Sequence, residues 1–191
     1  MDMSSDEQLI ANYFAGDEKS LEVLILRYLK SIYNFVYRYV NDEHEAEDIT
    51  QEVFLKMWRN LKKFKKGKNF KTWLFTIAKN TAIDFLKKKK IIPFSEFEKE
   101  DGENKFIETL VDPAPSLDEI FEKTEIDEKI YNAINQLPLK YQIVLFLYYN
   151  DQLTFQEIAE ILGESINTVK SRHRRALFIL KKILKDRRDN E

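Results

Sequence analysis

Apolar residues recur at three- and four-residue spacing along most of the chain, and this pattern predicts a protein built from α-helices. In the first half, the spacing predicts four helices, over residues 4–14, 18–40, 43–61 and 69–90. Polar breaks separate them: Gly16, the Asn41–Asp42 pair and a lysine-rich stretch with Gly67. Because these connections are short, we expect the four helices to form a compact bundle.

Two of these helices have apolar faces that can be read directly from the sequence. In the helix over 18–40, the expected inward residues are Leu21, Leu24, Ile25, Tyr28, Leu29, Ile32, Phe35, Val36 and Tyr39. In the helix over 69–90, they are Phe70, Trp73, Leu74, Ile77, Thr81 and Phe85. Asp42, with Glu45 three residues later, is expected to form a capping box at the start of the third helix.

The character of the sequence changes after residue 90. Residues 91–117 contain three prolines and a glycine among many acids, show no sustained period, and are longer than the roughly 12–15 residues of most loops. Helical periodicity resumes near Ser116, and Pro138 suits the first position of a further helix. We therefore expect an all-α protein with two small four-helix domains, residues 1–92 and 117–191, joined by a flexible acidic linker, residues 93–116.

The stretch from Thr154 to Leu184 is typical of a helix-turn-helix. Thr154 and Glu157 have the spacing of a capping box, and they precede a short apolar run. Gly163 follows that run, where the chain must leave the helix with positive φ. Ser165 can then cap a second helix.

This second helix has two distinct faces. One face is apolar, and the other is rich in hydrogen-bond donors and cations. The polar face consists of Asn167, Lys170, Ser171, Arg174 and Arg175. Taken alone, such a charge run is typical of a solvated surface, but its combination with the turn favours a helix that reads bases in a major groove.

Composition narrows the functional classes. The 191 residues contain no cysteine, which excludes disulfides and fits a reducing compartment. The acidic N-terminus does not resemble a signal peptide, and no apolar run approaches the roughly 18 residues of a membrane span. We therefore expect a cytoplasmic protein.

Charge is strongly segregated although the net charge is only −2. Residues 61–90 carry eleven lysines against one acid, a net charge of +10. Residues 93–128 carry thirteen acids against three lysines, a net charge of −10. Residues 165–188 carry nine Lys or Arg against one acid, a net charge of +8. Two basic zones predict contact with a polyanion at two places.

The first basic zone interleaves lysines with aromatic residues, as do surfaces that bind single-stranded nucleic acid. Asn80, Asp84 and Lys87 share the polar side of the fourth helix, and Asn80 can both donate to and accept from a base edge. A core position is the simpler interpretation for Phe70, but Phe64 lies in the polar break and stays an open question.

The third helix carries the opposite charge. Glu45, Asp48, Gln51 and Glu52 share one face at helical spacing. His44 is not placed to complete a metal site, and no nucleophile or glycine-rich phosphate cradle lies nearby. The residues alone leave two interpretations open, a docking surface for a basic partner and a solvated face.

Three stretches together resemble the extracytoplasmic-function (ECF) branch of the bacterial sigma-70 family of RNA polymerase sigma factors. They are AEDITQEVFLKMWRNLKKF, FKTWLFTIAKNTAIDFLKKKK, and the run from INQLPLKYQIVLFLYYND through TVKSRHRRALFILKKIL. The resemblance covers residues 21–90 and 130–185 in the family's order. The chain departs from the family pattern at Asn167, where many members have glycine.

The resemblance implies a sigma region 2-like first domain and a sigma region 4-like second domain, with these roles for individual residues. Residues expected to dock on the polymerase clamp are Glu45, Asp48, Gln51 and Glu52. Residues expected to capture the unpaired −10 strand are Phe64, Lys65, Lys66, Asn69, Lys79, Asn80, Asp84 and Lys87. Residues expected to read the −35 duplex are Asn167, Thr168, Lys170, Ser171, Arg174 and Arg175.

The implied function is transcription initiation without catalysis. The implied partners are core RNA polymerase, at its clamp and flap regions, promoter DNA in duplex and single-stranded form, and an anti-sigma factor that could hold the protein at the membrane. No cofactor, metal or small-molecule substrate is expected. The linker matches by position the segment that the family threads toward the RNA exit path. We also hypothesise that its acids repel DNA in the free protein.

Two other classes compete with this interpretation. A stand-alone helix-turn-helix regulator that binds duplex operator DNA would account for the second domain, but not for the lysine–aromatic zone or the acidic helix. A metal enzyme built on the acidic helix would need ligands that the sequence does not supply.

Overall fold

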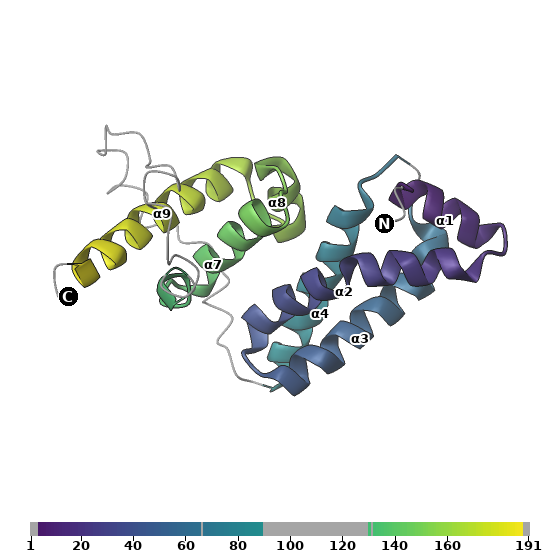
Figure 1. The fold of residues 1–191 in the computed structure, drawn as a ribbon, viewed down its shortest axis with the longest axis horizontal. Helices are drawn as coiled ribbons and strands as arrows, with labels where there is room; N and C mark the ends of the chain where they lie inside the picture. The colour runs from purple at the N-terminus through teal and green to yellow at the C-terminus, as the bar shows by residue number, and fades with distance from the viewer. Residues whose placement is uncertain (1–3, 66, 90–129, 131, 189–191) are drawn as a thin grey trace. The chain divides into compact units, whose positions relative to one another are not determined.

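The computed structural model describes residues 4–65, 67–89, 130 and 132–188. Every regular element in these ranges is helical, which confirms the all-α prediction. The described helices separate into two compact units, with α1–α4 in one and α7, η4 and α9 in the other (Figure 1). The expected linker, residues 93–116, and the domain limits beside it lie outside the described residues, so they stay predictions.

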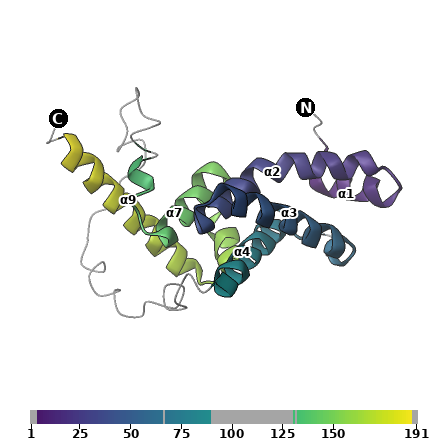
Figure 2. The same cartoon turned by 90° about the horizontal axis from the view of Figure 1, so that it is seen from below.

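The first unit contains four α-helices and a short 3-10 turn. They are α1 (Asp6–Phe14), α2 (Glu18–Val40), α3 (Glu43–Asn60), η1 (Leu61–Lys63) and α4 (Phe70–Lys89). Helices α2, α3 and α4 pack against one another, and α1 packs on α2 (Figures 1 and 2). The sequence placed all four helices within two residues of these bounds.

Side chains next to the helix ends explain where the helices of this unit begin. Asp17 Oδ1 accepts from the backbone N–H of Lys19 at the start of α2. Asp42 Oδ1 accepts from the Glu45 N–H at 2.9 Å, as the predicted cap of α3 requires. Asn41 ends α2 with φ of 51°, a left-handed conformation that asparagine tolerates better than most residues.

The core of the first unit forms where the apolar faces of α2, α3 and α4 meet. Phe35 and Phe75 are fully buried, with ring centroids 5.1 Å apart in an edge-to-face arrangement. Six of the nine expected inward residues of α2 are buried, but Leu29 is 42% exposed, so its prediction was wrong.

The buried face of α4 is rotated from the predicted one. Trp73, Ile77 and Phe85 are only partly buried. The buried residues of α4 are Phe70, Thr72, Leu74, Phe75, Ala78, Thr81, Ala82 and Leu86. The prediction favoured the larger apolar side chains, whereas close helix packing places the small residues Ala78 and Ala82 at the interface.

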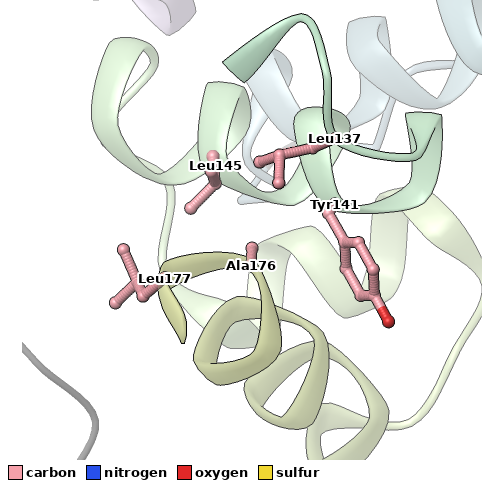
Figure 3. Packing of buried hydrophobic residues seen from close by; sticks show 5 residues of the cluster. All are labelled: Leu137, Tyr141, Leu145, Ala176 and Leu177. Carbon is pink, nitrogen blue, oxygen red and sulfur yellow. The ribbon is translucent and has the colours of Figure 1, made fainter. Parts of the chain in front are cut away.

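The second unit is built on α7 (Leu139–Leu145), a single π-helical turn η4 (Phe146–Asn150), and the long α9 (Ile166–Arg188). Pro138 occupies the N-cap of α7 rather than the predicted first helical position. Tyr141 and Leu145 of α7 pack against Ala176 and Leu177 of α9 (Figure 3). This cluster joins the two helices into one core.

Helix α8 (Phe155–Leu162) ends at the predicted glycine. Gly163 has φ of 72°. Its N–H donates to Ala159 O at 2.9 Å, and the N–H of Glu164 donates to the same oxygen at 3.0 Å. These bonds satisfy the Ala159 carbonyl in the last turn of α8 and confirm the glycine-terminated turn.

Candidate nucleic-acid and protein-docking surfaces

The four predicted docking residues lie on α3. Asp48, Gln51 and Glu52 are exposed, and Glu45 is partly buried. Two of the carboxylates have lysine partners within the unit: Glu52 pairs with Lys56 one turn later, and Glu45 pairs with Lys89 at the end of α4. The face is therefore acidic but partly neutralised, and Asp48 is an exposed carboxylate with no ion pair to another residue in the described ranges.

The same face of α3 carries large apolar side chains that the sequence did not single out. Leu55 is 49% exposed and Trp58 is 50% exposed. Leu55 follows Asp48 by seven residues, so the two side chains lie on one side of the helix. That spacing could have indicated from the sequence that Leu55 lies on the docking face. A single leucine or tryptophan in an amphipathic helix, however, is more often assigned to the core. Exposed apolar residues beside charged ones are typical of protein-binding surfaces.

A hollow of about 430 Å³ lies beside this face, between α2 and α3. It is lined by Leu26, Leu29, Lys30, Tyr33, Glu47, Thr50 and Gln51. Desolvation and the nearby carboxylates of Glu43 and Glu47 raise the pKa of Tyr33, so the phenol stays protonated. Gln51 thus belongs to the acidic face of α3 and also lines this hollow.

The predicted −10 residues lie on α4 and in the segment before it. Asn80, Asp84 and Lys87 are all exposed along one side of α4. Lys65 is exposed before the helix, and Lys66 lies outside the described residues. The predicted residues Asn69 and Lys79 also belong to this segment, just before α4 and on it.

Asn69 has a structural role that the sequence did not predict. Its Oδ1 accepts from the Thr72 N–H at 3.0 Å, and its carbonyl accepts from the Trp73 N–H. These are the bonds of an N-cap, so Asn69 fixes the start of α4.

Phe64 is held in an aromatic cluster. Its ring centroid lies 5.0 Å from that of Trp73 and 5.6 Å from that of Phe70. The side chain is partly buried. Packing of this kind supports the turn before α4, which favours a structural role over a freely available stacking platform.

The predicted −35 residues occupy the first three turns of α9. Asn167 and Lys170 are exposed, while Ser171, Arg174 and Arg175 are partly buried. On the other side of the helix, Val169, Ala176, Leu177 and Leu180 of the predicted apolar face are buried, whereas its last member, Leu184, is partly buried. The structure therefore places the predicted donors on one side of a helix whose other side is anchored in the core.

The N-terminus of α9 is capped by Ser165. Ser165 Oγ accepts from the Thr168 N–H at 3.0 Å and lies 2.8 Å from Thr168 Oγ1. This confirms Ser165 as the cap. The hydroxyl of Thr168, a residue predicted to contact DNA, therefore takes part in the cap.

Among the described residues, no group of three or more His, Asp or Glu side chains could hold a metal ion. In the same ranges, no helix is both long and apolar enough to span a membrane.

Family models match both halves of the chain. Sigma-70 region 2 matches residues 24–91, and Sigma-70 region 4 matches residues 127–177. The first match contains the acidic face of α3 and the exposed row of α4. The second contains α7, α8 and the first turns of α9.

Relatives and solved structures agree with these matches. The ECF RNA polymerase sigma factor SigW of Bacillus subtilis is 35% identical over 90% of this chain and 92% of its own length. The RNA polymerase sigma-H factor of Pseudomonas aeruginosa is 32% identical over 94% of this chain and 93% of its own. A co-crystal structure of the sigma factor RpoE with the anti-sigma factor NepR from Bartonella quintana covers 87% of this chain and 98% of its own, with 25% identity and a TM-score of 0.63.

The helical fold and its two matched regions define a bacterial transcription factor of the sigma type. The chain belongs to the sigma-70 family, in its extracytoplasmic-function group. Members of this family are non-enzymatic transcription factors, in agreement with the function class that the sequence implied.

Proposed function

We propose that this protein binds core RNA polymerase and directs it to promoters by reading a −35 duplex element with α9 and capturing the melted −10 strand with α4. The observation that carries the proposal is the presence of both sigma regions, in family order, in one chain. The boundaries that we propose are residues 1–92 for the region 2 domain, 93–116 for the linker and 117–191 for the region 4 domain.

Polymerase docking is assigned to the acidic and apolar face of α3. Asp48, Gln51 and Glu52 supply charge and hydrogen-bond acceptors, and Leu55 and Trp58 supply apolar area in the same row. A protein interface typically combines an apolar centre with a charged rim that selects the partner. The partner surface should therefore be basic with an apolar centre, as we propose for the polymerase clamp.

Capture of the −10 strand is assigned to the exposed row on α4. Asn80 offers both a donor and an acceptor to a single unpaired base, and Lys87 and Lys65 offer charge to phosphates. Extruding a base costs a few kcal/mol, which contacts of this kind must offset. No chemical step is required of the protein.

Reading of the −35 element is assigned to the polar face of α9. Arginine and lysine at the first turns can donate to guanine edges, and asparagine can pair with adenine. The remaining cations contact phosphates, which carry affinity but no sequence information.

The proposal is tested by reconstitution. Purified protein is mixed with core RNA polymerase and genomic DNA fragments, and the transcripts made are mapped to their start sites. We expect stable binding to core and starts preceded by shared −35 and −10 elements. Specific duplex binding that neither needs polymerase nor stimulates initiation would instead identify a stand-alone regulator.

The proposal also includes a regulatory partner and a cellular location. The similar structure of RpoE was solved with the anti-sigma factor NepR. We propose that this chain also binds an anti-sigma factor, which co-purification from the native cell would test. The protein acts in the cytoplasm in this proposal, because polymerase and promoter DNA are there.

A further inference from the structure

Four aromatic rings meet where α9 passes the π-helical turn. They belong to Tyr148 and Tyr149 of η4, to Phe155 and to His173 of α9. The Tyr148 and Phe155 rings are stacked, with centroids 4.7 Å apart and planes 15° apart. The His173 ring lies 4.8 Å from Tyr148, 5.1 Å from Phe155 and 5.6 Å from Tyr149. The imidazole is therefore surrounded by the other three rings.

Tyr148 and Tyr149 are consecutive residues of the π-helical turn, and both rings reach the same histidine. In a regular α-helix, consecutive side chains point about 100° apart. Residues 146–150 form a wider turn, of a type that is rare and often found at functional sites. The Tyr148 and Tyr149 rings lie 4.8 Å apart, and both contact His173.

His173 also forms a hydrogen bond within this cluster. His173 Nε2 lies 3.1 Å from Tyr149 Oη, and which atom donates follows from the tautomer. Burial lowers the pKa of His173, so the imidazole is neutral near pH 7. A neutral ring suits packing against three aromatic faces and still hydrogen-bonds through one nitrogen.

His173 lies within the stretch of α9 that carries the predicted DNA-reading residues. Arg174 follows it, and Lys170 precedes it by one turn. Val169 is buried near the start of that stretch, and Ala176 and Leu177 pack against α7 toward its other end. Apolar packing is not directional, whereas a hydrogen bond restricts both distance and angle. The Tyr149 contact can therefore set the rotation of the reading turns more tightly than the apolar cluster alone.

We propose that His173, through its hydrogen bond to Tyr149, is a positioning residue that fixes the rotation of α9 so that its polar row meets the −35 base edges. This inference rests on the proposed function. Sites that read hydrogen-bonding patterns need their side chains held within about 0.5 Å of the productive geometry. His173 does not contact DNA in this proposal.

The test compares variants that remove the hydrogen bond but keep the rings. Tyr149→Phe removes one hydroxyl, His173→Phe removes the imidazole nitrogens, and a double variant removes both. Tyr148→Phe is the matched control. It removes a hydroxyl from the same cluster, but His173 contacts the ring of Tyr148 and hydrogen-bonds to the hydroxyl of Tyr149. Thermal unfolding checks that each variant is folded. If His173→Phe fails to fold, Tyr149→Phe carries the test with Tyr148→Phe as its control.

The readout is the ratio of holoenzyme affinities for a promoter mapped with wild-type protein and for the same promoter with a scrambled −35 element. A hydrogen bond of ordinary net strength corresponds to about a two- to tenfold fall in this ratio. We expect that fall for each single variant, no further fall for the double variant, and unchanged affinity for the scrambled promoter. Tyr148→Phe should match wild type.

Three outcomes would overturn the inference: an unchanged ratio in Tyr149→Phe and His173→Phe, losses that multiply in the double variant, or an equal loss in Tyr148→Phe. A fall in affinity for both promoters alike would show a general structural role and also count against positioning. Failure of the proposed function is distinguishable, because wild-type holoenzyme would then show no preference for the −35 element at all.

Discussion

The ammonium group of Lys56 lies 2.8 Å from Glu52 Oε1, one turn earlier on α3. The same Nζ donates to Thr81 Oγ1 of α4 at 3.2 Å. One lysine thus joins a predicted docking carboxylate to the helix that carries Asn80. Lys56 also neutralises part of the charge that a basic partner would meet.

Replacement of Lys56 by methionine tests whether this lysine lowers the affinity of the docking face for core polymerase. Since the pair is half-exposed and of the i,i+4 type, its loss should cost no more than about 0.5 kcal/mol of unfolding free energy. Thr81 keeps its bond to the Ile77 carbonyl, so no buried hydroxyl is left unsatisfied. With Glu52 no longer neutralised, affinity for core polymerase should stay equal or rise, as titration with labelled core would show. A marked fall would mean that Lys56 itself contacts the polymerase.

Reversal of charge on the docking face should have the opposite effect. Asp48→Lys with Glu52→Lys places two cations in a surface proposed to face a basic partner, where like charges cost several kcal/mol. We expect loss of core binding in gel filtration, with the helical circular dichroism signal retained. Glu7→Lys with Glu22→Lys is the matched control, because both residues are exposed and lie on α1 and α2. Equal loss in the control would point to a non-specific charge effect.

The positions of the helices could be predicted from sequence because caps and periodicity act locally. Ser165, Asp42 and Gly163 each occupy the predicted cap or turn. Which face of a helix is buried was harder to predict. Leu29 is exposed, whereas Ala78 and Ala82 are buried, because tertiary packing selects by shape as well as by apolar size.

Spacing and charge were enough to predict that the rows on α3, α4 and α9 each share one side of a helix. The roles given to their residues came from the family resemblance and stay predictions. The cluster around His173 could not be predicted, because it brings together rings from η4, Phe155 and α9 that lie apart in the sequence. No periodicity in the sequence indicates the π-helical turn either. Asn69 and Thr168 show a related limit, because a polar residue near a helix start can serve as a cap or take part in one.

Asn80→Ala should separate the two promoter contacts. Asn80 is exposed on α4, and its amide is proposed to pair with an extruded base of the −10 strand. We expect reduced formation of strand-separated complexes, measured by permanganate reactivity of unpaired thymines, with −35 footprints retained. Asn132→Ala, another exposed asparagine, is the control. Normal melting by Asn80→Ala would remove this residue from the site.

Arg175→Ala and Lys170→Ala should distinguish base contacts from phosphate contacts on α9. If Arg175 donates to a base edge, its loss should cost about 1–3 kcal/mol and relax selection at one position of the −35 element. A phosphate contact by Lys170 should weaken binding on all sequences alike and lower the salt dependence by about one ion. Selection of −35 sequences from a randomised promoter, at two salt concentrations, measures both. Uniform loss with Arg175→Ala would reassign that residue to the backbone.

The stability of the second unit should decrease as the solution is made acidic, because of His173. Burial lowers its pKa in the folded protein, while in the unfolded chain the pKa is near the ordinary value of about 6.5. Above that pH the imidazole is neutral in both states and contributes no pH dependence. As the pH falls through 6.5 toward the lower folded pKa, the unfolded chain binds a proton first, so the free energy of unfolding falls by at most about 1.4 kcal/mol per pH unit.

Other groups titrate in the same range, so the measurement is a comparison with His173→Phe. The rings that face His173 are Tyr148, Tyr149 and Phe155, and Lys170 lies one turn away on α9. Urea unfolding of the full chain, followed by the amide resonances of α9, gives the stability of the second unit at pH 7.5 and 5.5. The decrease on acidification should be larger in wild type than in His173→Phe, since only wild type carries the titrating ring. An equal decrease in both proteins would show that His173 has the same proton affinity in the folded and unfolded chain.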